Sequence, residues 1–145
     1  MSKPIFITLE GVDGAGKSTH IDFIKNYFDA KKINFYMTRE PGGTDLGEKL
    51  RKSLLHENMD PLTETIIMFA ARCEHIKSVI RPKLESNITV VSDRFTDATY
   101  AYQHGGKGID LESIDMLKKL IQKELEPDLT FLFDLPVSVS IERLK

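Results

Sequence analysis

The residues with the clearest chemical potential form one run near the N-terminus. This run reads Gly11-Val12-Asp13-Gly14-Ala15-Gly16-Lys17-Ser18 and fits the pattern G-x-x-x-x-G-K-S/T. Glycines in such a loop let backbone N–H groups turn toward phosphate oxygens, and the following helix adds a favourable dipole. We expect Lys17 to reach the β- and γ-phosphates of ATP and Ser18 to offer its hydroxyl to Mg²⁺. The expected nucleotide-binding residues are Gly11, Val12, Asp13, Gly14, Ala15, Gly16, Lys17, Ser18 and Thr19.

The elements that must position this loop follow from apolar runs along the chain. Four runs of continuous apolarity are expected to be strands, at residues 5–9, 33–37, 88–92 and 129–135. Strands of this kind alternating with helices predict an α/β fold, a parallel sheet with helices on both faces. Ligands in such sheets bind beyond the carboxyl ends of the strands. The candidate residues fall at those ends, namely 11–18, 39–44, 93–94 and Asp134.

Three helices are predicted from capping signals and from apolar positions spaced three or four residues apart. The first spans residues 17–31, with Ile21, Ile24 and Phe28 inward. The second starts at Asp60-Pro61 and carries an apolar stripe of Ile66, Phe69, Cys73, Ile76 and Ile80. The third is capped by Asp110, with Ile114, Leu117 and Ile121 inward. A further short helix is expected to begin at Pro136.

Composition narrows the classes of protein. The 145 residues suggest one domain, and 20 basic against 22 acidic residues give a net charge of -2. This balance offers no basic footprint for nucleic acid or for a membrane surface. Cys73 is the only cysteine, so no internal disulfide can form, and no apolar run is long enough for a membrane span. We expect a soluble cytoplasmic protein.

Three motifs in order carry a resemblance to a known family. They resemble the signature sequences of the thymidylate kinases. The first is residues 10–19, the second is Arg39-Glu40-Pro41-Gly42-Gly43-Thr44, and the third is Asp93-Arg94-Phe95 followed by Ala101-Tyr102-Gln103. The similarity runs from about Phe6 to the last residue. It implies a P-loop NTPase-type sheet, transfer of the ATP γ-phosphate to dTMP to give dTDP for dTTP synthesis, and a homodimer. A GTPase is excluded because the chain has no Asn-Lys-x-Asp segment.

The acceptor of such a reaction is an anion, so arginines must hold it close to ATP. A guanidinium fork matches phosphate oxygens in a bidentate manner, which is a physical use for Arg39, Arg51 and Arg94. Arg39 could instead brace its own loop, and Arg51 could belong to a solvated helix face. Asp93 could hold Mg²⁺ through water or orient Arg94. By resemblance, Asp13 accepts a hydrogen bond from the sugar 3′-hydroxyl, and Lys17, Arg94 and Asp13 are the expected catalytic residues.

The base is expected to lie against the helix that starts at Pro61. By resemblance, Arg72 hydrogen-bonds thymine. The family often has an aromatic residue where this chain has Met68, so the base could be covered by Met68 or by Phe69, which could equally be core. The resemblance also implies three more residues around the base and ribose: Thr99 and Gln103 at the base edge, and Tyr102 against the ribose 2′ position, although Tyr102 could equally be a packing residue.

The end of the sequence leaves two classes of function open. With Ala15 and Ser18 in its P-loop, the chain resembles those relatives that have no arginine in the loop and take catalytic arginines from a mobile lid. The lid is expected to follow the helix that begins at Pro136, and the sequence ends at Lys145. We therefore expect residues 1–145 to form one kinase domain without its lid, its last strand or its closing helices. The chain would be a thymidylate kinase in partial form, or a nucleotide-binding fragment with little catalysis. A third possibility is another nucleoside or nucleotide kinase of the same fold.

Overall fold

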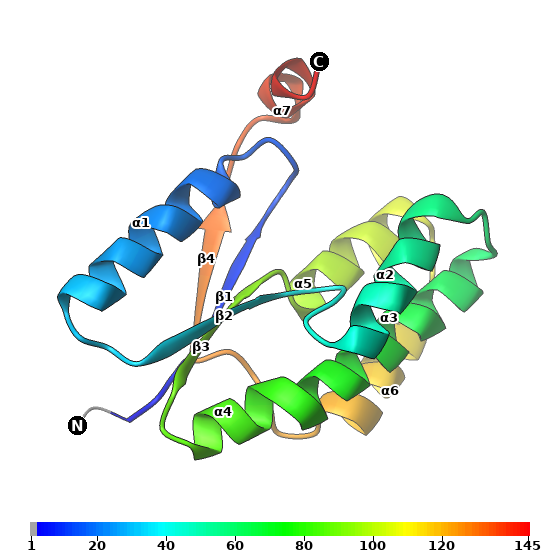
Figure 1. The fold of residues 1–145 in the computed structure, drawn as a ribbon. Coiled ribbons are helices and arrows are strands. Elements are labelled where there is room, and N and C mark those ends of the chain that lie inside the picture. The colour runs from blue at the N-terminus through cyan, green and yellow to red at the C-terminus, as the bar shows by residue number, and fades with distance from the viewer. Residues whose placement is uncertain (1–2) are drawn as a thin grey trace.

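The computed structural model describes residues 3–145 and has a four-stranded parallel sheet at its centre (Figure 1). The strands are β1 (Phe6–Gly11), β2 (Phe35–Arg39), β3 (Thr89–Asp93) and β4 (Leu129–Phe133), in the order β2-β3-β1-β4. Every neighbouring pair is parallel, which requires a long crossover between partners. The predicted α/β fold class is confirmed.

The helices lie on both sides of this sheet (Figure 1). They are α1 (Lys17–Ala30), α2 (Asp45–His56), α3 (Pro61–His75), α4 (Arg81–Glu85), α5 (Thr96–Thr99), α6 (Leu111–Gln122) and α7 (Val137–Arg143). Two π-helical segments extend them without a break: η1 (Ile76–Ile80) joins α3 to α4, and η2 (Tyr100–Gly106) follows α5. The helix predicted from Pro61 is therefore one continuous rod of three segments.

Successive side chains of a strand point to opposite faces of the sheet, and both faces of this sheet are covered by helices. On one face Phe6 and Val90 pack with Ile76 and Ile80 from η1. On the other face Ile7, Leu9 and Val91 pack with the predicted inward residues of α1, which are Ile21, Ile24 and Phe28. The continuous apolar runs are explained by this double coverage.

Local signals begin the helices where the sequence predicts. The Asp60 carboxylate accepts hydrogen bonds from the N–H groups of Leu62 and Thr63, with Pro61 in the first turn. The Asp110 carboxylate accepts from the N–H of Ser113 at 2.8 Å. Such caps satisfy N–H groups that have no partner inside the helix, so they fix the first turn in place.

Two predictions about burial are wrong. Ile66, expected on the buried stripe of α3, is 50% exposed, whereas Arg72 and His75 on the same helix are fully buried. Strand β4, expected to be buried, exposes Leu129, Phe131 and Leu132. Because β4 is the last strand of the sheet, no element within residues 3–145 pairs with its outer edge.

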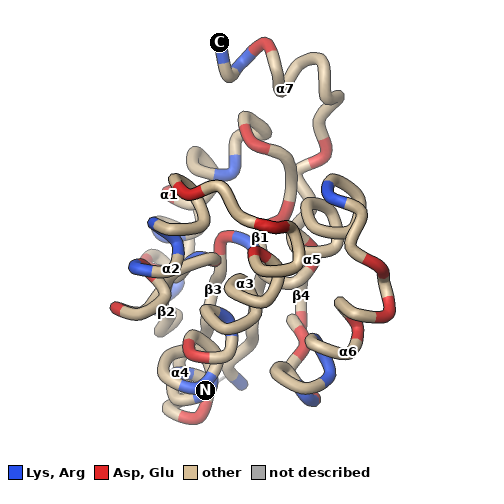
Figure 2. Tube along the Cα trace, turned by 90° about the vertical axis from the view of Figure 1, so that its right-hand side faces the viewer, with Lys and Arg blue, Asp and Glu red and all other residues tan. Residues whose placement is uncertain are grey.

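Charge is spread over the whole trace. Figure 2 shows basic and acidic positions scattered among uncharged ones over the helices and loops, in keeping with the net charge of -2. Among residues 3–145, none of the helices has the length and apolarity that a membrane crossing requires.

The burial pattern of the continuous rod yields a matched test. Ile80→Ala should lower the free energy of unfolding by about 2–5 kcal/mol, because the side chain is fully buried against β1 and β3. Ile66→Ala removes the same atoms from a half-exposed site and should cost under about 1 kcal/mol. Urea unfolding of both variants measures the difference, and equal losses would contradict the packing described above.

Candidate functional site

Two adjoining cavities open beyond the carboxyl ends of the strands. The P-loop cavity, about 520 Å³, is lined by loop residues 13–14 and 16–19, Arg39, Asp93 and Arg143 among others. The second cavity is about 300 Å³ and is lined by residues that include Met68, Arg72, Phe95, Tyr102 and Gln103. We call it the base cavity because several residues that the sequence analysis expects around the base line it. Four residues line both cavities: Asp13, Glu40, Arg51 and Arg94. The site therefore has two compartments with a shared, charged wall.

The P-loop is shaped around Lys17. The Lys17 ammonium donates to the carbonyl oxygens of Gly11 at 2.8 Å and Val12 at 3.1 Å, inside the loop that it follows. Burial, and secondarily the charge of Arg94, lowers the pKa of Lys17. Gly14 and Gly16 have φ of 78° and 93°, a left-handed backbone that glycine adopts without strain. A buried cation bonded only to carbonyl oxygens is well placed to exchange them for phosphate oxygens.

One carboxylate oxygen in the lining of the P-loop cavity has no hydrogen-bond partner within residues 3–145. Oδ1 of Asp93, at the end of β3, is buried and has no hydrogen bond within the described residues. Ser18 and Thr19 line the same cavity. Among residues 3–145 no group of three or more His, Cys, Asp or Glu side chains is arranged to hold a metal. Mg²⁺ bound to nucleotides needs only one or two protein ligands, so Asp93 and Ser18 fit such an ion.

Arg94 stands in the wall between the cavities. Its guanidinium donates to Oδ1 of Asp13 at 2.6 Å and lies 5.1 Å from the ring of Tyr102. Its backbone is left-handed, with φ of 71°, which costs energy for a residue other than glycine. The hydroxyl of Ser92 donates to the Arg94 carbonyl oxygen at 2.7 Å and helps to hold this turn. A strained backbone retained at the wall of a cavity is typical of functional positions.

Glu10 supports the same turn from β1, and sequence reasoning missed it. Its carboxylate accepts from the N–H of Phe95 at 2.7 Å. Burial raises the pKa of Glu10 from 4.5 to about 7, and the Phe95 hydrogen bond partly opposes that rise. The only sequence signal was a carboxylate directly before the P-loop, which says nothing about burial.

The two other predicted arginines both line the P-loop cavity. Arg39 pairs with Glu48 at 2.8 Å, and both side chains are about half exposed. Arg51 donates to the carbonyl oxygen of Pro41 at 2.9 Å, and the Glu40–Pro41 peptide bond is cis. Arg51 thus lies on the inner side of α2 rather than on a purely solvated face, while Arg39 does brace its own loop.

Arg72 is the most completely buried charge in the site. Its Nε donates to Oε2 of Glu40 at 2.6 Å, and its Nη2 donates to the Phe95 carbonyl at 3.1 Å and to the Thr99 hydroxyl at 3.0 Å. The rings of Phe69 and Phe95 lie 5.0 and 5.2 Å from the guanidinium carbon. Nη1 is buried without a hydrogen bond in the described residues. The other two nitrogens of this guanidinium are already bonded, which leaves Nη1 to donate to a ligand.

Several predicted base contacts have different positions from those expected. Phe69 is 1% exposed and packs on Arg72 outside the cavity lining, so Met68 and Phe95 line the cavity in its place. Thr99 is also fully buried and bonds Arg72 rather than facing the cavity. Both side chains lie behind Arg72, away from the cavity, and the spacing of residues along a helix does not reveal such burial.

Gln103 and Tyr102 do line the base cavity. The Gln103 amide donates to Glu64 at 2.9 Å, while its Oε1 is buried without a partner in the described chain. Tyr102 is 43% exposed and lines the cavity beside Arg94. Gln103 therefore offers an acceptor and Arg72 a donor to the same space.

Helix α7 brings a further arginine to the P-loop. Nη1 of Arg143 donates to the Gly14 carbonyl oxygen at 3.1 Å, and the Ser140 hydroxyl donates to that of Asp13 at 2.5 Å. In Figure 1, α7 stands beside the turn between β1 and α1. Arg143 was not among the predicted site residues, because catalytic arginines near ATP were expected from a lid. No local sequence signal marks Arg143, since its position depends on how α7 packs against the P-loop.

A family profile described as Thymidylate kinase matches residues 9–145. The chain belongs to the thymidylate kinase family. It is 56% identical over 139 residues to the thymidylate kinase of Methylobacillus flagellatus, covering 96% of this chain and 68% of that protein. It is 52% identical over 147 residues to that of Nitrosomonas europaea, covering 100% of this chain and 68% of the relative. The crystal structure of thymidylate kinase from Ehrlichia chaffeensis superposes with a TM-score of 0.83 at 38% identity, over 99% of this chain and 83% of that one.

The family fixes the reaction class. This thymidylate kinase transfers a phosphoryl group from ATP to dTMP and produces dTDP. The predicted activity and the predicted donor, ATP, are confirmed at the level of the family. This result favours a thymidylate kinase over a different nucleoside or nucleotide kinase of the same fold.

The raised pKa of Glu10 predicts a pH-dependent stability difference. Between about pH 4.5 and 7 the unfolded chain loses this proton while the folded chain keeps it, so stability falls as pH rises through that window. Gln at this position keeps an oxygen for the Phe95 N–H but cannot ionise. Relative to the native chain, Glu10→Gln should therefore gain about 1–3 kcal/mol in free energy of unfolding between pH 5 and pH 8.

Urea unfolding at both pH values measures this gain. Glu57→Gln, at an exposed position, is the matched control and should show no comparable difference. A stability difference for Glu10→Gln that is the same at both pH values would mean that the buried carboxyl does not titrate in this window.

Proposed function

We propose that the P-loop cavity binds the phosphates of ATP and that the base cavity binds dTMP, with the acceptor phosphate at their shared wall. The supporting observation is that Arg94 and Arg51 line both cavities. Phosphoryl transfer depends on bringing two anions together and neutralising their charge more than on covalent chemistry. A wall of guanidinium groups between the two compartments meets that requirement.

Each charged side chain then has a part. Lys17 would hold the β- and γ-phosphates, and Arg94 would hold the acceptor phosphate and the transferring group between them. Ser18 and Asp93 would hold Mg²⁺, which when bound neutralises phosphate charge. Asp13 is 65% exposed and bonded to Arg94, so it remains free on its outer side for the sugar 3′-hydroxyl.

The acceptor side uses two further groups of residues. Arg51 and Arg39 would complete the phosphate contacts from the α2 side. Arg72 and Gln103 would offer a donor and an acceptor to the base, and Tyr102 would limit space at the ribose 2′ position. Thr99 and Phe69 would act on the base through Arg72, because both contact its guanidinium.

Arg143 would contribute positive charge on the donor side. Its guanidinium already lies against the Gly14 carbonyl of the P-loop, and it lines the same cavity as Lys17. A homodimer also remains a prediction, which exposed apolar side chains on α3 and α6 support: Leu62, Ile66, Met116 and Leu120.

Crossed calorimetry tests the assignment of substrates to cavities. Lys17→Ala should weaken Mg·ATP binding about tenfold or more, the worth of a lost contact to a charged group, and should leave dTMP binding nearly unchanged. Arg72→Met should do the reverse. Each variant controls for the folding of the other, and a variant that weakens both ligands equally would contradict the two-compartment arrangement.

Arg143 gives a second test, on rate. Arg143→Met should lower kcat by about a thousandfold, the lower end of the effect of losing an arginine finger, while the Kd for dTMP stays the same. A coupled ADP-release assay measures the rate. Arg81→Met is the matched control, since Arg81 bonds the Gln122 carbonyl at 3.1 Å outside both cavities. An unchanged kcat would remove Arg143 from the mechanism.

A further inference from the structure

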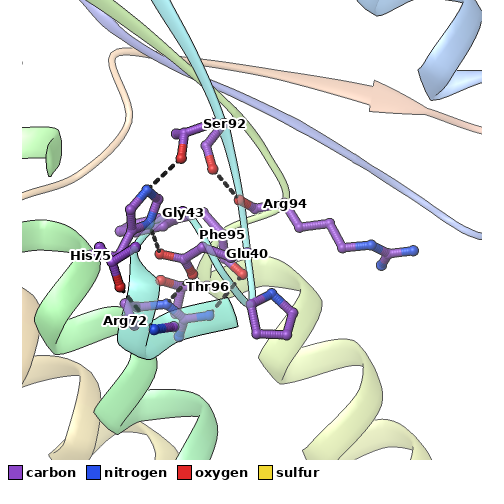
Figure 3. Close-up of polar contacts among 12 residues, drawn as sticks. Glu40, Gly43, Arg72, His75, Ser92, Arg94, Phe95 and Thr96 are labelled. Carbon is purple, nitrogen blue, oxygen red and sulfur yellow. Dashed lines mark hydrogen bonds and ion pairs between the residues drawn. The ribbon is translucent and has the colours of Figure 1, made fainter. Parts of the chain in front are cut away.

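A buried histidine lies behind the base cavity without lining it. His75 is 0% exposed and Glu40 is 3% exposed. Nδ1 of His75 lies 2.9 Å from Oε1 of Glu40, and Nε2 lies 2.6 Å from the Thr38 hydroxyl oxygen. Figure 3 shows His75, Glu40 and Arg72 pointing toward one another. The motifs that predicted the activity gave His75 no part.

The direction of these hydrogen bonds follows from donor inventories. An ionised carboxylate only accepts, so the proton in the His75–Glu40 bond must lie on Nδ1. In the neutral ring Nε2 then accepts from the Thr38 hydroxyl. The His75 ring is thereby held in one orientation, with Thr38 of β2 bonded to one nitrogen and Glu40 to the other.

Glu40 divides its two oxygens between two partners. Oε1 accepts from His75, and Oε2 accepts from Nε of Arg72. The Glu40 backbone is held separately, because its N–H donates to the Asp93 carbonyl at 2.9 Å. With both oxygens bonded, the carboxylate cannot rotate. Without His75, the carboxylate would keep only its bond to Arg72 and could turn with it.

The orientation of Arg72 matters because only one of its nitrogens is free. Nη1 has no partner in the described chain, and the side chain lines the base cavity. A guanidinium only donates hydrogen bonds. It can therefore bond a carbonyl at position 4 of a pyrimidine, as in thymine or uracil, but it opposes the amino group that cytosine carries there.

We infer that His75 is a positioning residue for base selectivity: by holding Glu40 it aims Arg72 so that the site prefers a 4-carbonyl pyrimidine to a 4-amino one. This inference rests on the proposed role of Arg72 in the base cavity. The substrate property that it controls is the preference for dTMP over dCMP. Preference for dTMP over dUMP, which differ only in the methyl group, is independent of His75.

Two substitutions separate the hydrogen bond from the mere presence of a buried side chain. The amide nitrogen of Asn overlays Nδ1, so His75→Asn keeps a donor to Glu40. The amide of Gln reaches the position of Nε2, so His75→Gln keeps a partner for Thr38 and leaves Oε1 of Glu40 without its donor. Glu40→Gln is an independent variant, because its amide oxygen can accept from only one of its two partners.

Calorimetry with dTMP, dUMP and dCMP on each variant tests the inference, with Mg·ATP binding as the control for folding. His75→Gln and Glu40→Gln should each reduce the dTMP-to-dCMP affinity ratio about tenfold, the worth of one charge-assisted hydrogen bond. The dTMP-to-dUMP ratio should stay constant. His75→Asn should keep both ratios within about twofold of the native chain.

The outcomes distinguish this inference from the proposed function. If Arg72→Met leaves the dTMP-to-dCMP ratio unchanged, the proposed base contact of Arg72 is wrong. If Arg72→Met lowers the ratio and Glu40→Gln or His75→Gln does not, the positioning role is overturned. Equal losses in His75→Asn and His75→Gln would also overturn it, because packing rather than the hydrogen bond would then be responsible.

Discussion

The buried ion pair between Glu40 and Arg72 is the interaction around which the site is organised. Breaking such a pair leaves an unpaired charge in the interior, at a cost of about 3–5 kcal/mol. Its partners come from four parts of the chain: His75 and Phe69 on α3, Phe95 after β3, Thr99 on α5, and the loop after β2. The loop after β2 and helix α3 are therefore coupled to each other. Because Glu40 lines both cavities, this buried pair helps to determine how the two compartments meet.

Much of the fold could be predicted because its signals are local. The P-loop, the capping residues Asp60 and Asp110, and the four apolar strands each depend on neighbours within a few positions. Burial depth could not be predicted in the same way. Phe69 and Ile66 share an apolar character and a helix, yet one is 1% and the other 50% exposed, because α3 turns its charged Arg72 and His75 inward. Arg143 was missed because the docking of α7 is a tertiary event.

The segment η2 shows how local helix geometry shapes the site. A π-helical turn widens the helix by one residue, and such turns often occur at functional sites. Tyr102 and Gln103 are adjacent in the sequence and lie within this turn, and both line the base cavity. Thr99, in the regular turn before, points behind the cavity toward Arg72. The sequence analysis had placed all three residues around the base and ribose.

The strand order has a consequence for how the chain reaches this state. β1 is the first strand to be synthesised and carries the P-loop, yet its register pairs Phe6 with Val90 on one side and Ile7 with Leu129 on the other. Strand β1 therefore has no pairing partner until β3 and β4, which lie much later in the sequence, have been synthesised. Non-local parallel pairing of this kind folds slowly and leaves apolar strands exposed to aggregation in the meantime. The strand that carries the nucleotide-binding loop is thus encoded early but completes its pairing only after β3 and β4 have been made.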